Sequence, residues 1–341
     1  MAEQATSTSG ATETQVTPSS PAPDLEVDSL TTETDSAYGD ELSVYTASVT
    51  SSVTDFYEEN GRRYHAYREG RYLLPNDEKE NERLDIHHAL IQAAMDDRLF
   101  LAPIGDKHQR VLDICTGTGI WAIEFADQFP SAEVLGNDLS PTQPTFVPPN
   151  VKFLVDDVED EWGYEDEPFD FIHARYLVGS VKDMKRLIKQ AYACTKPGGW
   201  AEFQDWDVNP YSPDGTVKGT SVERYMTLMA NVFQKAGYTT LIGRHLEEWM
   251  KETGFINVGV QRLILPLGTW PKDKKYKRIG AFNLVQYLET LEANAMAALT
   301  RVEGWSKQEV EVLVAHTRAD AKNPKVHTQF DFYVVWGQKP Q

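Results

Sequence analysis

Short apolar runs alternate with helical patterns through the middle of the chain. The apolar runs are rich in Val, Ile, Leu and Phe and predict β-strands at 110–115, 132–136, 151–155, 169–174 and 200–204. Helices are expected at 120–129 and 184–195, and Pro197 and two glycines end the second one. Strands and helices in alternation are typical of a parallel sheet wound by crossover helices.

Longer helical patterns flank two later strands. Helix is expected at 77–101, 221–253 and 276–318, and strands at 257–265 and 330–336. The pattern predicts an α/β fold with a seven-stranded sheet and an inserted helical cap, its insertions at about 216–253 and 276–325. The cap helices carry apolar faces that either pack in the core or bound a ligand pocket. These faces are centred on Tyr225, Met226, Met229, Phe233, Tyr287, Leu288, Leu291 and Met296.

The N-terminal region differs in composition from the rest of the chain. Residues 1–54 contain 21 Ser or Thr and no periodicity, which predicts a disordered acidic tail. Residues 55–105 are expected to form a helical lid segment before the main domain at 106–341. Its aromatic stretch 56–72 either closes over a ligand, placing Tyr64 or Tyr67 near it, or packs against the core.

Charge and cysteine usage exclude several classes of protein. The net charge is −19, and residues 1–61 hold 12 acids and no Lys or Arg, so the remainder carries 33 bases against 40 acids. Direct nucleic-acid binding is therefore not expected. Cys115 and Cys194 lack metal-ligand spacing, and neither a metal site nor a disulfide is predicted.

Targeting signals are equally sparse. The chain shows no secretory signal and no apolar run long enough for a bilayer, so no membrane partner is expected and the protein is predicted to be soluble and intracellular. The basic cluster at 272–278 is interpreted as a solvated loop rather than a nuclear import signal, which leaves cytoplasm and nucleus open.

The loop after the first predicted strand carries the chemistry. Gly117 and Gly119 permit a tight turn and close approach of a ligand, and the helix that follows points its amide groups at that ligand. Asp138 ends the second strand, where it can accept both hydroxyls of a ribose. Asp113 and the acids after the third strand suit a cationic amino-acid nucleoside and oppose a pyrophosphate. These residues favour a methyltransferase over a nicotinamide dehydrogenase, although 117–122 also fits the dinucleotide pattern.

Three segments resemble a known family. Residues 111–124 (VLDICTGTGIWAIE), 136–144 (GNDLSPTQP) and 196–203 (KPGGWAEF) resemble class I S-adenosylmethionine-dependent methyltransferases, a Rossmann-like fold, and specifically the fungal LaeA-like group. Segments at 57–68, 74–78, 83–86 and 326–329 are similar to that group too, so the resemblance covers about residues 55–340. It implies S-adenosyl-L-methionine as cofactor.

The resemblance also implies roles for individual residues. Asp113, Gly117 and Gly119 would line the methionine end of the cofactor, Asp138 the ribose, and Asp157 with Val158 the adenine. One departure from the family pattern is Cys115, which stands where glycine is usual and is expected to be tolerated there as a buried, inert thiol.

Residues after the fourth strand are candidates for the transfer step. His173 and Tyr176, with Arg175 between them, are placed at the sheet edge where a methyl group would be presented, and either His173 is a base or it is a core histidine. Asp205 and Asp207 either orient an acceptor or cap a turn.

Two functions are compatible with these features. The favoured one is methyl transfer to an O or N atom of a small-molecule acceptor in fungal secondary metabolism. The alternative is a LaeA-like regulator that acts on protein partners through its tail, by protein or self methylation or without turnover.

Overall fold

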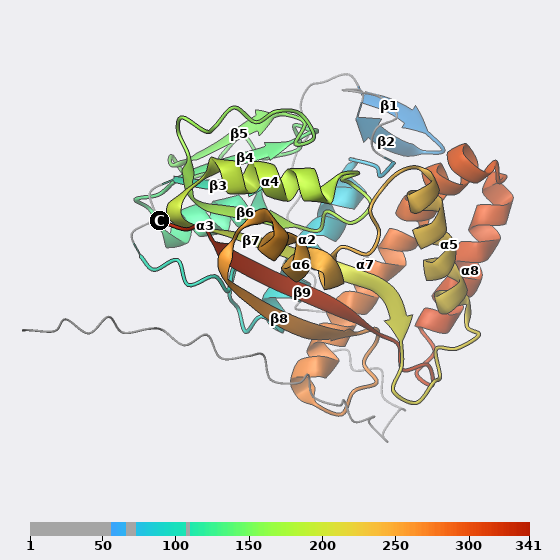
Figure 1. The fold of residues 1–341 in the computed structure, drawn as a ribbon. Coiled ribbons are helices and arrows are strands. Elements are labelled where there is room, and N and C mark those ends of the chain that lie inside the picture. The colour runs from blue at the N-terminus through green and yellow to red at the C-terminus, as the bar shows by residue number, and fades with distance from the viewer. Residues whose placement is uncertain (1–55, 66–72, 107–109) are drawn as a thin grey trace, which may run out of the picture.

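A seven-stranded sheet forms the centre of the molecule, with helices on both faces and a helical cap at one end (Figure 1). The computed structural model describes residues 56–65, 73–106 and 110–341. The strands are β3 (Arg110–Ile114), β4 (Glu133–Asp138), β5 (Val151–Val155), β6 (Phe169–Arg175), β7 (Thr195–Tyr211), β8 (Ile256–Pro266) and β9 (Gln329–Gln338). The expected seven-stranded α/β architecture is confirmed.

The strand order places a ligand crevice at the end of β3. The order is β5-β4-β3-β6-β7-β9-β8, with the first five strands parallel and β9 antiparallel between β7 and β8. The chain leaves β3 toward β4 on one side and returns to β6 on the other. This reversal opens a crevice beyond the carboxyl ends of the strands, the usual ligand site of such sheets.

Alternating residues of β3 bind helices to the two faces of the sheet. Val111 belongs to a core cluster with Trp121 and Phe125 of α3 (Ile120–Gln128). Leu112 and Ile114 belong to the cluster that holds α4 (Met184–Cys194) and α6 (Leu246–Thr253). The period of two along the strand thus sends successive side chains to opposite layers.

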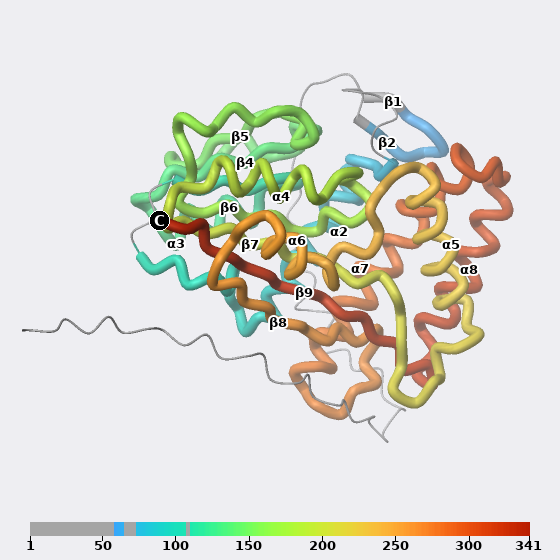
Figure 2. The backbone as a smooth tube through the Cα atoms, viewed as in Figure 1, coloured from blue at the N-terminus to red at the C-terminus, as the bar shows by residue number. Residues whose placement is uncertain are grey.

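The cap assembles from segments that are far apart in sequence. Helices α2 (Glu78–Ala94), α5 (Ser221–Lys235), α7 (Lys274–Ala298) and α8 (Lys307–Ala321) share one apolar core with the ends of β7, β8 and β9. In Figure 2 the N-terminal α2 runs beside the late helix α7. The cap therefore includes an N-terminal helix in addition to the two expected insertions.

Two of the expected long helices are broken. The stretch 221–253 divides into α5 and, after a loop and a short 3₁₀ turn at Gly243–His245, α6, which packs on α4 and the sheet instead of the cap. The stretch 276–318 divides into α7, a π-helical turn at Leu299–Glu303, and α8. Ser306 and Glu309 form a reciprocal capping box that starts α8. The prediction of one continuous helix followed the apolar pattern and missed this local signal.

The lid segment begins as a hairpin rather than a helix. Strands β1 (Phe56–Glu59) and β2 (Arg62–His65) pair antiparallel around Asn60 and Gly61, both at positive φ, a preferred two-residue hairpin turn. Helix α2 stops at Ala94, seven residues before the expected end, because Asp96 and Asp97 adopt left-handed conformations. The tail at 1–54 and Tyr67 lie outside the described residues.

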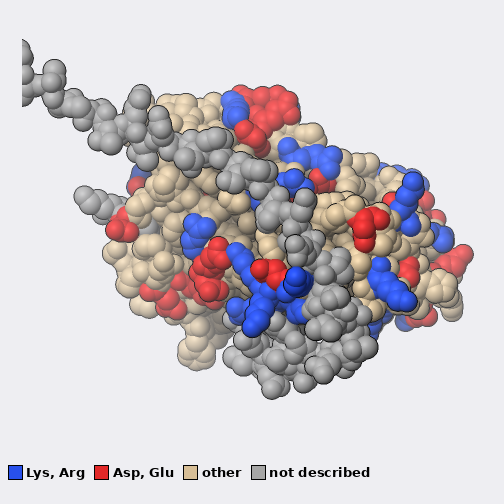
Figure 3. Space-filling view, turned by 90° about the horizontal axis from the view of Figure 1, so that it is seen from below, with Lys and Arg blue, Asp and Glu red and all other residues tan. Residues whose placement is uncertain are grey.

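The basic cluster is helical for most of its length. Lys274 to Arg278 form the first turns of α7, capped by the Asp273 carboxylate, so the loop prediction is wrong for these residues. On the face shown in Figure 3, Lys and Arg side chains lie interspersed with Asp and Glu. Among the described residues, no helix is long and apolar enough to cross a membrane.

Candidate functional site

The loop between β3 and α3 is shaped by the aromatic ring below it. Gly119 caps α3 at a φ of 80°, and a Cβ added there would lie 2.5 Å from Cζ of Phe153 on β5. Gly136 on β4 faces the same ring, and a Cβ added at this position would lie 2.7 Å from it. A Cβ at either position would require the Phe153 ring to move, so this ring determines how closely the loop lies over the sheet.

Cys115 occupies a backbone position that favours glycine. Its φ is 53°, in the left-handed region, and its amide donates to Asn137 Oδ1 at 3.3 Å. Burial raises the pKa of its thiol well above the ordinary value. Cysteine is accommodated here at a backbone cost of about 1 kcal/mol, as an unreactive thiol.

Asp138 closes the same loop from β4. Its Oδ2 accepts from the Gly117 amide at 2.9 Å, and its Oδ1 accepts from the Ser140 amide at 3.0 Å. Burial raises its pKa to about 6 despite these bonds. A carboxylate has about four acceptor sites, so two remain for a diol.

Asp113 and His173 form a buried pair at the bottom of the crevice. His173 Nδ1 lies 2.7 Å from Asp113 Oδ1, and the Thr116 hydroxyl donates to Asp113 Oδ2 at 2.5 Å. The imidazole stacks on Trp121 with a centroid distance of 3.7 Å. Because burial lowers its pKa, His173 is neutral and its Nδ1–H donates to Asp113. This geometry makes His173 a support for the carboxylate.

The predicted cofactor residues meet around one cavity at the ends of the parallel strands. Its lining includes Asp113, Cys115, Gly117, Asp138, Asp157, Val158, His173 and Tyr176. Gly119, the N-cap of α3, is not among the lining residues, although its neighbours Thr118 and Ile120 are. Tyr64 does not line it; the Tyr64 side chain is buried in the hairpin, with the Arg301 guanidinium 4.9 Å from its ring centre. Whether each lining residue contacts the cofactor stays a prediction.

Helix α2 supplies a wall that the sequence did not reveal. Leu84 and His87 line the cavity, and Trp206 Nε1 donates to His87 Nε2 at 3.0 Å. Burial lowers the pKa of His87 well below its usual value. A helical pattern at 77–101 was visible in the sequence, but nothing in it indicated which face meets the crevice.

Arg175 brings positive charge to this otherwise acidic cavity. Its guanidinium donates to His88 Nδ1 at 2.8 Å, and His88 Nε2 lies 3.0 Å from Glu124. Burial lowers the pKa of Arg175 to about 10, so it remains a cation at neutral pH. Arg175 is therefore a cation in a lining whose carboxylates include Asp113, Asp138 and Asp157.

A second cavity adjoins the first at Tyr176. It lies between α5, α7 and the ends of β7 and β9, and Tyr176 lines both cavities. The Tyr176 backbone is left-handed, at a φ of 61°, and its amide donates to the Gln204 carbonyl. Five of the cap residues singled out in the sequence line this cavity, namely Tyr225, Met226, Met229, Phe233 and Tyr287.

Asp205 and Asp207 lie outside both linings. The buried Asp205 accepts from the Leu177 amide at 2.8 Å and so holds the turn that carries Tyr176. Asp207 pairs with Arg244. Asp205 therefore stabilises a turn and Asp207 forms an ion pair, and neither lines a cavity of the described structure.

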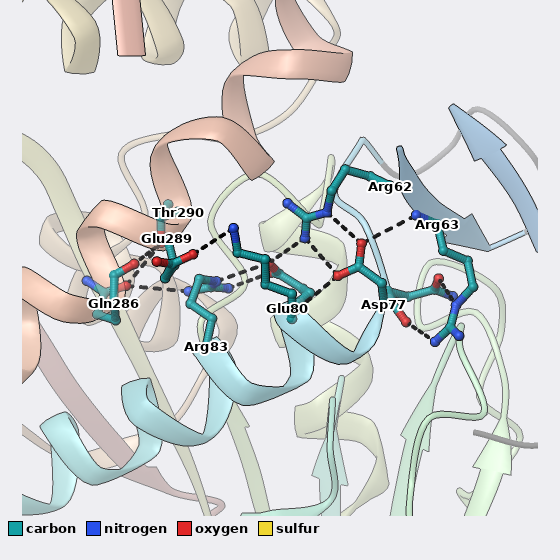
Figure 4. Close-up of polar contacts among 10 residues, drawn as sticks. Arg62, Arg63, Asp77, Glu80, Arg83, Gln286, Glu289 and Thr290 are labelled. Atoms are coloured by element: carbon teal, nitrogen blue, oxygen red, sulfur yellow. Dashed lines mark hydrogen bonds and ion pairs between the residues drawn. The ribbon is translucent and has the colours of Figure 1, made fainter. Parts of the chain in front are cut away.

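A buried ionic network ties the hairpin, α2 and α7 together (Figure 4). Arg62 of β2 pairs with Asp77 at 2.5 Å, and Arg83 pairs with Glu80 at 2.6 Å. Arg83 also donates to Gln286 Oε1 at 3.4 Å, and its guanidinium lies 5.3 Å from the Tyr176 ring centre. The network thus reaches the wall shared by the two cavities.

The first cavity fits a nucleoside amino acid better than a dinucleotide. Carboxylates at or just beyond the ends of β3, β4 and β5 line it, together with Arg175. This charge pattern suits an amino acid and a ribose and is adverse to a pyrophosphate. The fold and the site together define a class I methyltransferase that uses S-adenosyl-L-methionine.

Comparison with known proteins gives the family. A model described as "Methyltransferase domain" matches residues 86–260, and the chain belongs to this family. The methyltransferase pytC of Aspergillus terreus is 44% identical over 295 residues, covering 86% of this chain and 91% of that protein. The secondary metabolism regulator LAE1 of Cochliobolus heterostrophus is 36% identical over 292 residues, covering 84% and 95%.

Two more distant matches complete the comparison. The protein-methionine methyltransferase laeA of Emericella nidulans is 32% identical over 296 residues, covering 85% of this chain and 78% of that protein. A Haemonchus contortus phosphoethanolamine N-methyltransferase structure with S-adenosylhomocysteine aligns with 76% of this chain and 53% of its own, at 21% identity and a TM-score of 0.43. The LaeA-like group predicted from the sequence is thereby confirmed.

Proposed function

We propose that this protein methylates an O or N atom of a small-molecule acceptor bound in the second cavity. The observation that carries the proposal is that Tyr176 lines both the cofactor cavity and the apolar cavity under the cap. A mostly apolar cavity next to a cofactor site is the usual setting for a small organic ligand.

The first cavity holds the cofactor by complementary charge. Asp138 accepts from the ribose hydroxyls, while Asp157 and the Val158 backbone meet the adenine. Asp113, oriented by His173, faces the methionine ammonium, and Arg175 faces the methionine carboxylate. The bound cofactor supplies a methyl group on a positively charged sulfur.

Alignment of the acceptor accounts for the catalysis. The acceptor heteroatom forms a bond to the methyl carbon as the carbon–sulfur bond breaks, leaving S-adenosylhomocysteine, and the proton on that heteroatom is released to bulk water. Tyr176 lies between the two cavities and orients the reacting atom, while the apolar cap excludes water. His87, which accepts from Trp206 at Nε2, keeps its proton on Nδ1 and acts as a donor rather than a base.

The test is to add a protein-free extract of small metabolites to the purified protein with S-adenosylmethionine. We expect S-adenosylhomocysteine to form only with the extract, and a methylated product to appear in it. Removal of residues 1–54 should leave this turnover unchanged. Transfer of the methyl group only to protein, or turnover that is lost when residues 1–54 are removed, would instead favour the regulator alternative.

A cavity-filling variant locates the acceptor. Met229→Trp adds volume inside the second cavity and should abolish turnover while S-adenosylhomocysteine still binds. The matched control is Val312→Trp, because Val312 is 56% exposed on α8. Full turnover by Met229→Trp would refute the assignment of this cavity to the acceptor.

A further inference from the structure

Helix α7 presents a polar stripe to the second cavity. Among the apolar lining residues, five polar side chains follow one another at helical spacing: Asn283, Gln286, Tyr287, Thr290 and Asn294. Within the described structure, the lining of this cavity contains no charged side chain and no histidine. The ligand that fits must therefore satisfy polar groups without bringing a charge.

Three residues of the stripe are already bound to protein. Asn283 donates to the Pro266 carbonyl at 2.8 Å, and Gln286 donates to Asn283 Oδ1 at 2.8 Å while accepting from Arg83 (Figure 4). The Thr290 hydroxyl donates to the Gln286 carbonyl at 2.8 Å. These bonds fix the orientation of each group, so this part of the wall is rigid.

The other two groups of the stripe are unsatisfied. Among the described residues, the Tyr287 hydroxyl and Asn294 Oδ1 are buried and have no hydrogen-bond partner. Tyr287 is 5% exposed, and burial raises the pKa of its phenol, so it keeps its proton and remains a donor. A buried polar group without a partner destabilises a protein, which makes a ligand the natural partner of both.

We infer that the acceptor is an uncharged, mainly apolar molecule of about two fused rings that accepts a hydrogen bond from Tyr287 and exchanges one with the Asn294 amide. The inference rests on the proposed assignment of this cavity to the acceptor. Tyr287 and Asn294 are two helical turns apart, about 10 Å along the axis, which matches a ring system with polar groups at both ends. Ammonium and carboxylate compounds are disfavoured because a buried charge needs a partner that the described lining lacks.

Matched probes on one skeleton test the inference. The protein is saturated with S-adenosylhomocysteine and titrated calorimetrically at pH 7 with 6-acetyl-2-naphthol, 6-hydroxy-2-naphthoate and 6-(aminomethyl)-2-naphthol. The neutral ketone should bind at least tenfold more tightly than the anion or the cation. Tyr287→Phe and Asn294→Leu should each weaken its binding about fivefold, whereas Tyr192→Phe, on α4 outside the cavity, should not.

A second readout separates ligand recognition from folding. Because the Tyr287 hydroxyl has no protein partner in the described structure, Tyr287→Phe should unfold at the same or a higher urea concentration. The inference is overturned if a charged probe binds as well as the ketone, if Tyr287→Phe leaves ketone affinity unchanged, or if the ketone does not bind. Failure to bind S-adenosylhomocysteine would instead refute the proposed function itself.

Discussion

Two glycines with the same backbone conformation permit a controlled test of the cofactor loop. Gly119 and Gly61 both have a φ of 80°, but a Cβ at Gly119 would lie 2.5 Å from Phe153 Cζ, whereas Gly61 has nothing within 4 Å. Gly61→Ala should cost about 1 kcal/mol, since left-handed strain of about 1–2 kcal/mol is partly offset by lower entropy of the unfolded chain. Gly119→Ala adds overpacking of about 1–3 kcal/mol, for a total of about 2–4 kcal/mol.

The assay is urea unfolding of the two variants and of a double-mutant cycle. Phe153→Leu removes the ring that the new Cβ would meet, so Gly119→Ala should cost less in that background than alone. Binding of S-adenosylhomocysteine should weaken at least tenfold in Gly119→Ala and stay unchanged in Gly61→Ala. Equal destabilisation by the two alanines, or no coupling to Phe153, would refute the reasoning that this ring determines how closely the loop lies over the sheet.

Three further predictions concern titratable side chains. Since the pKa of Asp138 is raised to about 6, affinity for S-adenosylhomocysteine should rise as pH increases through 6 and then level off. Asp138→Asn should weaken binding about 10- to 100-fold at pH 7.5 and flatten the pH profile of affinity. A flat wild-type profile by calorimetry would contradict the ribose assignment. Burial also raises the pKa of Glu202 to about 7, so the folded protein holds a proton that the unfolded chain releases near pH 4.5. The free energy of unfolding should therefore fall by about 3 kcal/mol from pH 4.5 to 7. In urea unfolding, Glu202→Gln should lack this decrease with pH. Cys115→Gly should change stability by no more than about 1 kcal/mol and keep or improve cofactor affinity, whereas a tenfold loss in a binding titration would show that the thiol contacts the ligand.

Local patterns predicted the cofactor half of the molecule well. Strand positions followed from apolar runs, and Asp113, Asp138 and Asp157 could be placed together because parallel strands end at one sheet edge. The pairing of Asp113 with His173 was not predicted. Those residues are 60 positions apart, and only the neighbouring register of β3 and β6 brings them side by side.

Patterns that were locally ambiguous produced the errors in the cap. The stretch 221–253 is apolar at helical spacing throughout, yet α6 leaves the cap to cover the sheet beside α4. The spacing of polar residues along α7 was a usable signal for a ligand wall. The stripe alone does not identify a ligand wall, because a polar stripe can equally face water. The sequence does not determine which face of a buried helix meets a cavity.

The sequence by itself determined what depends on neighbours along the chain: the order of strands and helices, the glycine loop and the acids at the strand ends. The tertiary structure alone decided the second cavity, the unsatisfied Tyr287 and Asn294, and the place of α2 in the wall of the first cavity. The physical reason is that a cavity is the space left where elements from distant parts of the chain meet. Its shape depends on how those elements dock, which no local pattern records.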